Sequence, residues 1–249
     1  MYNKLADELA VCGMKAVKAA VERNPDSINR FFMREDRFDL FRDFCGQLAQ
    51  RRRPYKVCDD EELLRICKDV HHQGVVAMLS NPTVEPLTRD DLELWAGEAK
   101  TGVVLHSVGN DMNMGAIVRA AAFFGVHFVV ISELDTDARL STSAYRAAEG
   151  GMEYVVIRSV KRTAAFLRDA SKSLFTIGAD TRARMRIGDL PDLMKGGGIA
   201  LVLGNEEAGL PEEVKRCCSA LVRIPGTGNM ESLNVSQSAA LFLNALYNL

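Results

Sequence analysis

The chain has 249 residues, 47% of them hydrophobic and 26% charged, and its 31 basic and 33 acidic side chains give a formal net charge of −2. This composition is that of an ordinary soluble globular protein, and the length suits one large domain or two small ones. No apolar run approaches the ~20 residues of a membrane-spanning helix, and the first twenty residues carry charges that a secretory signal lacks. We therefore expect a cytoplasmic protein that makes no membrane contact.

The six cysteines show neither C-x-x-C pairing nor histidine partners at zinc spacing, so we expect reduced thiols and no metal. The net charge argues mildly against nonspecific coating of nucleic acid, but local charge matters more. Basic side chains cluster at 51–56, 161–162 and 182–186, and a solvated surface is the simplest explanation of any one cluster. In the first, three guanidiniums beside a tyrosine suit phosphate pairing and base stacking. We predict RNA contacts from Arg51, Arg52, Arg53 and Lys56.

Residues 1–80 alternate helical and strand-like segments. The run from Ile28 to Met33 predicts a strand, and the segment from Asp60 to Val70 carries its apolar residues on one helical stripe. The sequence His71-His72-Gln73-Gly74 then leads into an apolar strand. We expect the two histidines to form a capped turn, because no third ligand lies at a spacing that suits a metal.

Regular structure is interrupted after residue 80. Pro82 and Pro86 break the pattern, and an acidic, polar segment follows around Trp95. We predict that residues 81–98 connect two domains, with Leu92 and Trp95 starting a short docking helix.

From residue 101, short apolar runs alternate with helical stretches, which predicts an α/β fold with a mostly parallel sheet covered on both faces. The runs are 102–107, 127–132, 154–158, 173–178, 199–204 and 220–224. Ligands bind such sheets at the carboxyl ends of the strands. Three polar blocks begin where strands end, so we expect them to lie together.

The first block, from Asn113 to Arg119, reads NMGAIVR, and the second, from Leu203 to Pro211, reads LGNEEAGLP. The third, from Ile224 to Ser236, reads IPGTGNMESLNVS. In sequence, order and spacing, the three blocks resemble the signatures of the SpoU (TrmH-like) RNA ribose methyltransferases, over roughly the last 150 residues. No dinucleotide-binding fingerprint or P-loop competes with this interpretation.

The resemblance implies the SPOUT fold, an α/β knot whose C-terminal segment threads through a loop as a deep trefoil knot. It also implies a homodimer that transfers a methyl group from S-adenosylmethionine to a ribose 2′-hydroxyl. The His-Gln-Gly turn and the helix after Gly13 resemble the smaller α/β L30e-like domain that binds the RNA substrate in many SpoU proteins. The expected organisation is an RNA-binding domain at 1–80, a linker at 81–98 and a catalytic domain at 99–249.

The resemblance also assigns roles to residues. Arg119 would stabilise the developing 2′-alkoxide or orient the ribose, and Glu206 would supply a polar contact or orient an arginine. Ser232 would face the reacting centre, cap the last helix, or do both. The expected catalytic residues are Arg119, Asn113, Ser232, Asn234 and Glu206. The expected cofactor-binding residues are Leu203, Gly204, Asn205, Ile224, Gly228, Ser232 and Leu233.

Four positions depart from the family pattern. Asn110 and Asp111 stand where Asp-Pro is common, Gly226 replaces a methionine, and Gln237 replaces a small residue. We expect the missing proline to loosen the first block's loop and to alter substrate choice. The substrate is expected to be structured RNA, with ribosomal RNA ahead of tRNA. The alternative function is a catalytically silent RNA-binding factor on a SPOUT scaffold, which would not bind S-adenosylmethionine.

Overall fold

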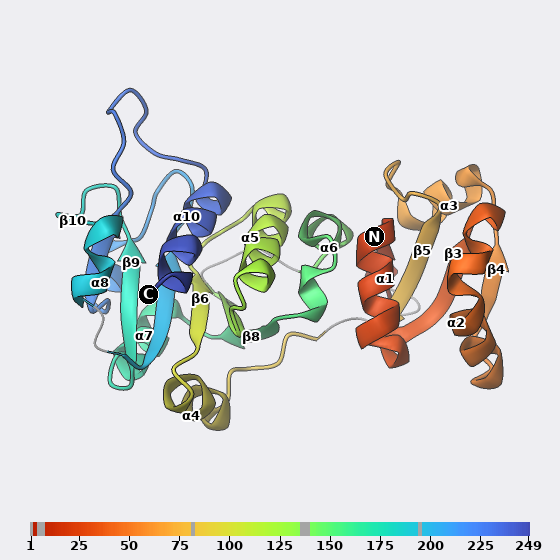
Figure 1. The fold of residues 1–249 in the computed structure, drawn as a ribbon, viewed down its shortest axis with the longest axis horizontal. Coiled ribbons are helices and arrows are strands. Elements are labelled where there is room, and N and C mark those ends of the chain that lie inside the picture. Colours follow the sequence, from red (N-terminus) through yellow and green to blue (C-terminus); the bar gives the residue numbers. More distant parts are fainter. Residues whose placement is uncertain (1, 4–7, 81–82, 135–139, 194–195) are drawn as a thin grey trace. The chain divides into compact units, whose positions relative to one another are not determined.

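A computed structural model describes residues 2–3, 8–80, 83–134, 140–193 and 196–249 of the protein. The chain forms two compact units (Figure 1). Unit 1 comprises residues 1–83 and 139–153, and unit 2 comprises residues 84–138 and 154–249. The chain therefore passes between the units three times. Asn81 and Pro82, which belong to the predicted linker, lie outside the described residues.

Unit 1 is built on a five-stranded sheet in the order β1-β2-β5-β3-β4, in which only β3 and β4 pair in parallel. Its strands are β1 (Tyr2–Asn3), β2 (Glu8–Cys12), β3 (Ile28–Met33), β4 (Tyr55–Val57) and β5 (Val75–Ser80). Its α-helices are α1 (Met14–Arg23), α2 (Phe38–Gln50), α3 (Asp60–Cys67) and α6 (Thr142–Ala148). The strand predicted at 28–33 and the helix predicted from residue 60 are both confirmed.

The two faces of this sheet hold different cores. On one face, Phe31 packs edge-on against Phe41 and Phe44 of α2, with ring centroids 5.1 and 5.3 Å apart. A separate cluster beside α3 contains three thiols among aliphatic side chains, those of Cys12, Cys58 and Cys67. All six cysteines of the chain are free. These thiols are apolar packing elements of unit 1.

The turn before β5 is closed by side-chain hydrogen bonds. The backbone N–H of Gly74 donates to His72 Nδ1 at 3.1 Å, and the N–H of Met14 donates to Gln73 Oε1 at 2.8 Å. His72 is buried. The predicted capped turn is thereby confirmed, and no group of three or more potential metal ligands occurs among the described residues.

Helix α6 lies far along the chain from the rest of unit 1, yet it packs against β2. Thr142 Oγ1 donates to the carbonyl oxygen of Ala10 at 2.7 Å, and Arg146 pairs with Asp69 at 2.9 Å. The division of contacts thus differs from the predicted domain limits at residues 139–153, which the sequence assigned to the catalytic domain. It also differs at residues 84–98, which lie in unit 2.

Unit 2 contains a seven-stranded sheet in the order β10-β12-β9-β11-β6-β7-β8, and every neighbouring pair is parallel. Its strands are β6 (Thr101–Leu105), β7 (Phe128–Ser132), β8 (Val156–Val160), β9 (Leu174–Ala179), β10 (Met185–Arg186), β11 (Gly198–Leu203) and β12 (Ala220–Arg223). Its α-helices are α4 (Arg89–Gly97), α5 (Asp111–Phe123), α7 (Thr163–Ala170), α8 (Leu190–Leu193), α9 (Glu212–Lys215) and α10 (Val235–Tyr247). The predicted parallel α/β sheet is confirmed, and β10 is a strand that the sequence did not indicate.

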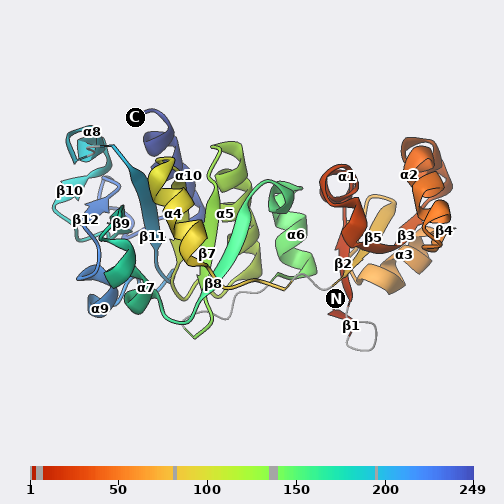
Figure 2. The ribbon, with the colours of Figure 1, turned by 90° about the horizontal axis from the view of Figure 1, so that it is seen from below.

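Helices cover both faces of this sheet. Figures 1 and 2 show α5 and α10 on one face and α4 and α7 on the other. No helix in the described part of the chain has the length and apolar character to cross a membrane. Both layers leave the carboxyl edge of the sheet to loops, which is where the three sequence blocks begin.

Helix α4 is held in the core of unit 2 by Trp95. This side chain is fully buried, its Nε1 donates to the carbonyl oxygen of Ile199 at 2.9 Å, and its ring stacks on Phe128 with centroids 5.1 Å apart. The ring fits because Gly102 of β6 has no side chain: a Cβ there would lie 2.1 Å from Trp95 Cζ2. The expected docking helix therefore forms part of the core that supports the sheet.

We predict that Gly102→Ala destabilises the protein by about 3 kcal/mol, because the added methyl group overpacks the contact with Trp95. Urea unfolding at equilibrium measures the change. The matched control is Gly97→Ala, which adds a methyl group to α4, the helix that carries Trp95, at a position with nothing within 4 Å. It should leave the midpoint within a few tenths of a molar of that of the unaltered protein. Equal midpoints for the two variants would contradict this packing.

Candidate active site

The paired ends of β6 and β11 form the base of the site. Leu105 and Leu203 are register partners at the carboxyl ends of these strands. Beyond them, the N–H of His106 donates to the carbonyl oxygen of Leu203 at 2.8 Å, and Asn205 Nδ2 donates to the carbonyl oxygen of Ser107 at 3.0 Å. The loop after β6 and the loop after β11 are thus tied together directly above the sheet.

Three polar side chains, one from each sequence block, then form a continuous chain of hydrogen bonds. Asn234 Nδ2 donates to Asn113 Oδ1 at 3.1 Å, and Asn113 Nδ2 donates to Glu206 Oε1 at 2.5 Å. Because the carboxylate can only accept, it fixes the orientation of the Asn113 amide, and that amide in turn orients Asn234. The blocks meet at one edge of the sheet, as the sequence predicted, although 121 residues separate Asn113 from Asn234.

Asn110 begins the helix that carries Asn113. Its Oδ1 accepts from the N–H of Met112 at 2.8 Å, which makes Asn110 the N-cap of α5. Asp111 follows in the first turn, where a carboxylate interacts favourably with the helix dipole. The departure from Asp-Pro at these positions therefore retains a capped helix start, and the expected loosening of this loop finds no support in the hydrogen bonding.

The second block folds back on itself in a tight turn. Asn205 Oδ1 accepts from the backbone N–H groups of Glu207 and Ala208 at 2.9 and 3.0 Å. A Cβ on Gly204 would lie 2.5 Å from the carbonyl carbon of Gly209. The missing side chain of Gly204 thus makes room for the backbone of its own loop, and Asn205 holds that loop closed.

The third block is an open loop. Its residues from Pro225 to Leu233 are exposed, and no backbone–backbone hydrogen bond involves them within the described part of the chain. Gly228 has φ +89°, a conformation that favours glycine. The last helix is capped by Asn234, whose Oδ1 accepts from the N–H of Ser236 at 2.8 Å. The proposal that Ser232 caps this helix is therefore wrong: Ser232 lies two residues before the cap.

The remaining predicted catalytic residue, Arg119, lies on the same helix as Asn113 and is exposed. Six residues separate the two along α5, a rise of about 9 Å. The hydrogen-bond chain of Asn234, Asn113 and Glu206 thus forms without Arg119, and its catalytic role stays a prediction.

Three of the four predicted RNA-binding residues have partners within unit 1. Arg53 Nη1 donates to the carbonyl oxygens of Asp26 and Ile28, both at 2.7 Å. Arg51 pairs with Asp26 and Lys56 with Glu62, both at 2.5 Å. Such partners reduce the positive charge available to a phosphate, so the RNA contacts of this segment also stay predictions.

His106 is a candidate site residue that the sequence analysis did not single out. It is buried at the carboxyl end of β6, and its Nδ1 lies 3.1 Å from Thr163 Oγ1. The available signal was a polar side chain placed directly after a buried strand. This contact links the loop that precedes Asn110 to the start of α7.

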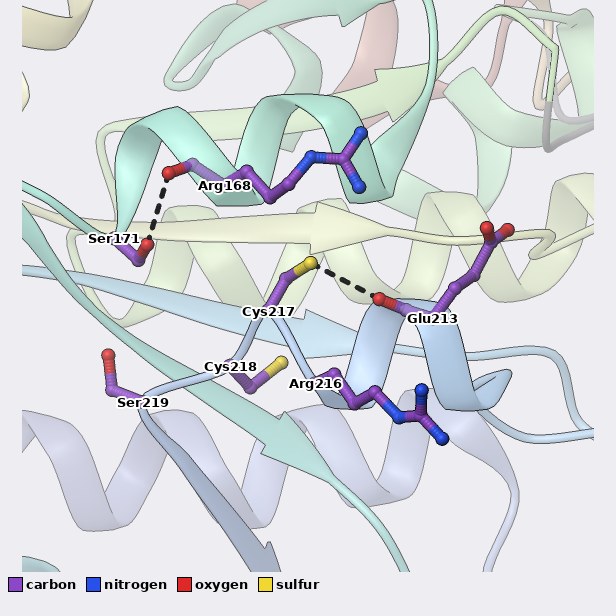
Figure 3. Close-up of a pocket in the computed structure, with 7 residues that line it drawn as sticks. All are labelled: Arg168, Ser171, Glu213, Arg216, Cys217, Cys218 and Ser219. Carbon is purple, nitrogen blue, oxygen red and sulfur yellow. Dashed lines mark hydrogen bonds between the residues drawn. The ribbon is translucent and has the colours of Figure 1, made fainter.

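A hollow of about 640 Å³ lies elsewhere in unit 2 (Figure 3). Ser219 at its rim precedes β12, which places the hollow near the amino ends of the strands. Cys217 Sγ donates to the carbonyl oxygen of Glu213 at 3.2 Å, as expected for a thiol that packs on a helix. Its lining contains none of the predicted site residues: Arg168, Ser171, Glu213, Arg216, Cys217, Cys218 and Ser219. The hollow therefore does not coincide with the candidate active site at the carboxyl edge.

The fold and the three converging blocks define an α/β protein with its polar site at the carboxyl edge of a parallel sheet. The model of the SpoU rRNA Methylase family matches residues 100–244, and the model of the RNA 2′-O ribose methyltransferase substrate-binding domain matches residues 10–84. The chain belongs to the SpoU rRNA Methylase family. The resemblance inferred from the sequence is confirmed.

Similar proteins cover nearly the whole chain. The 23S rRNA (guanosine-2′-O-)-methyltransferase RlmB of Nitrosomonas europaea is 30% identical over 94% of this chain and 88% of its own length. The enzyme of the same name from Neisseria meningitidis is also 30% identical, over 96% of this chain and 95% of its own length. The AdoMet-bound rRNA methyltransferase from Sinorhizobium meliloti has the same fold, with a TM-score of 0.80 at 21% identity over 97% of this chain and 87% of that chain.

We predict that Asn110→Ala lowers the free energy of unfolding by about 1 kcal/mol, because the first turn of α5 loses its side-chain cap. Asn110→Asp retains an acceptor at the cap, so its free energy of unfolding should stay within a few tenths of a kcal/mol of that of the unaltered protein. Urea unfolding of both variants measures the difference. Loss of equal size in both would show that the cap does not stabilise this helix.

Proposed function

We propose that the protein transfers a methyl group from S-adenosylmethionine to the 2′-hydroxyl of a guanosine ribose in 23S ribosomal RNA. The observation that carries this proposal is the hydrogen-bond chain Asn234–Asn113–Glu206, which joins the three blocks of the SpoU pattern at the carboxyl edge. The names of the two RlmB relatives support the choice of ribosomal RNA and of guanosine. The matched substrate-binding domain supports RNA as the partner of unit 1.

The open third block suits the cofactor. Backbone N–H groups from Gly226 to Leu233 have no backbone partner in the described chain and lie just before the start of α10, where a helix presents further donors. Exposed Leu233 offers apolar surface beside them. The proposed cofactor-binding residues are Leu203, Gly204, Asn205, Ile224, Gly228, Ser232 and Leu233. When bound, S-adenosylmethionine supplies an activated sulfonium methyl group.

The protein's own contribution is then position and charge. A ribose hydroxyl is a very weak acid, so a cation close to its oxygen makes the attacking group more nucleophilic. Arg119 is the proposed cation. Asn113, held by Glu206 and Asn234, is proposed to orient the ribose, and Ser232 is proposed to face the reacting centre.

We predict that Arg119→Ala lowers methyl transfer by about a hundredfold or more, because the developing alkoxide loses its counter-charge. The assay follows labelled methyl from S-adenosylmethionine into total RNA from a strain that lacks this gene, with identification of the 2′-O-methylnucleoside. Affinity for the cofactor, measured by calorimetry, should stay within a few fold. Arg168→Ala, which removes an exposed helix arginine at the other edge of the sheet, is the matched control.

The outcomes separate the role of Arg119 from the reaction itself. Loss of cofactor binding in Arg119→Ala would contradict its assignment to the substrate. Cofactor binding without any label in 2′-O-methylguanosine, on RNA from the strain that lacks the gene, would contradict the proposed reaction. Absence of both label and cofactor binding in the unaltered protein would favour an RNA-binding scaffold.

We also propose that the protein is a homodimer, built through α5 and α10. These two helices are neighbours on one face of the sheet (Figure 1) and expose large apolar side chains. Phe123 is 81% exposed and Tyr247 is 68% exposed, and Phe124 bridges them with ring centroids 5.0 and 5.9 Å away. An exposed aromatic group of this kind is typical of an interface.

We predict that Phe123→Glu raises the dimer dissociation constant by about a hundredfold, because a carboxylate cannot enter an apolar interface without losing its hydration. Sedimentation equilibrium of the full chain measures the change. Leu40→Glu, which introduces the same charge at a 66% exposed leucine of unit 1, should leave association unchanged. A monomeric unaltered protein at micromolar concentration would overturn the proposal.

A further inference from the structure

Four arginines lie at the outer edge of the unit 2 sheet. Arg182, Arg184 and Arg186 occupy the segment that leads through β10, and Arg223 ends β12. Because β10 pairs only with β12, it is the edge strand (Figure 1). We call these four residues the edge arginine group.

The register of the edge strand brings two of these charges together. Arg186 and Arg223 are partners in the parallel pair, as are Met185 and Val222. Partners leave the same face of a sheet, on strands about 5 Å apart. Two like charges are thus adjacent, an arrangement that destabilises a sheet unless an anion offsets it.

Within the described residues, no carboxylate forms an ion pair with either of these two guanidiniums. No member of the edge arginine group forms an ion pair within the described residues. Two carboxylates lie close to the group and accept hydrogen bonds from its backbone. Asp180 pairs with Lys215 at 2.7 Å and accepts from the backbone N–H of Arg182 at 2.9 Å. Asp189 accepts from the backbone N–H of Arg186 at 2.7 Å.

The arginines of unit 1 differ in this respect. Most of them are paired with carboxylates, namely Arg30, Arg34, Arg37, Arg42, Arg51, Arg65 and Arg146. The chain carries an overall charge of −2. The four members of the edge arginine group, by contrast, belong to the unit that also carries the candidate active site.

The position of the group relates it to that site. All strands of the sheet are parallel, so β10 and β12 end at the carboxyl edge, with Arg186 and Arg223 as their last residues. The open third block begins directly after Arg223. A nucleic acid whose ribose lies over this block has its neighbouring phosphates within reach of long cationic side chains.

We infer that the edge arginine group binds the phosphate backbone of the RNA substrate beside the nucleotide to be methylated. This inference rests on the proposed RNA methyltransferase function, and it places substrate contacts on the catalytic unit as well as on unit 1. Phosphate contacts of this kind position a nucleic acid without reading its sequence. The guanidiniums of the group suit them because each can bind phosphate through two donors, and Arg182, Arg184 and Arg186 are exposed.

Charges on an edge strand can also serve to prevent pairing with another chain. If the edge arginine group had only this role, its removal would increase aggregation and would leave the affinity for RNA unchanged. The salt dependence of RNA binding separates the two roles, because each phosphate contact contributes to its slope.

The test compares Arg184→Gln/Arg186→Gln with Arg168→Gln/Arg216→Gln, a matched pair of exposed arginines at the hollow of Figure 3. The probe is 23S ribosomal RNA stripped of protein, titrated with the full chain at several KCl concentrations, without methyl transfer. The edge variant should lower the slope of log affinity against log salt by about 1.4 and weaken binding about tenfold at 0.15 M salt. The control should change neither.

A third variant, Arg184→Lys/Arg186→Lys, keeps the charge and should keep the slope. Cofactor affinity should be the same in all variants. The unfolding midpoint of Arg184→Gln/Arg186→Gln should be no lower than that of the unaltered protein, because the substitution removes one of two adjacent like charges. Equal slopes for the unaltered protein and the edge variant, or equal losses in the edge and control variants, would overturn the inference. Because this readout is binding, a failure of methyl transfer in the unaltered protein would refute the proposed function without changing the slopes.

Discussion

The parallel pairing of β6 with β11 is the constraint on which the site depends. Five register pairs run from Thr101 with Ile199 to Leu105 with Leu203, so the two strands end side by side. Because the strands end at the same height, the loops that follow them form hydrogen bonds with each other. The first residues of α5 then come within hydrogen-bonding distance of Glu206. A shift of one residue would separate these loops and turn each strand's side chains to the opposite face. Gly102 has no side chain, so Trp95 can pack directly against the sheet. This packing holds α4 against these strands.

Much of this architecture could be predicted from the sequence, because strands buried on both faces appear as continuous apolar runs. The six predicted strands of the catalytic region begin and end within two residues of the observed ones. Strand β10 could not be predicted, since a strand of two residues, Met185 and Arg186, is too short to show a periodicity. The packing of α6 in unit 1 and the ion pairs of Arg51 and Lys56 depend on tertiary contacts that leave no local pattern. The cap of α10 was placed two residues too early because Ser232 and Asn234 are both good N-cap residues.

In the hydrogen-bond chain from Asn234 to Glu206, each side chain orients the next one. Two neutral amides are oriented by a single carboxylate. Loss of the Glu206 carboxylate would therefore also remove the group that orients Asn234, at the start of the last helix. Asn234 also accepts from Ser236, and it thereby connects the reactive edge to the backbone of α10. The fold thus couples the start of α10, which packs against α5, to the same residues that are proposed to orient the ribose.

Unit 1 is made of two segments that lie far apart in the chain, and this has a consequence for its synthesis on the ribosome. This unit includes α6, whose residues emerge only after the whole of the segment 84–138 has been made. Domains usually fold as units, with the N-terminal one first. Here the N-terminal sheet must wait for α6 with β2 incompletely covered, while β6 and β7 of the other unit are already outside the tunnel. The two units therefore cannot mature strictly one after the other, and slow translation through residues 84–138 would prolong the exposure of that unfinished core.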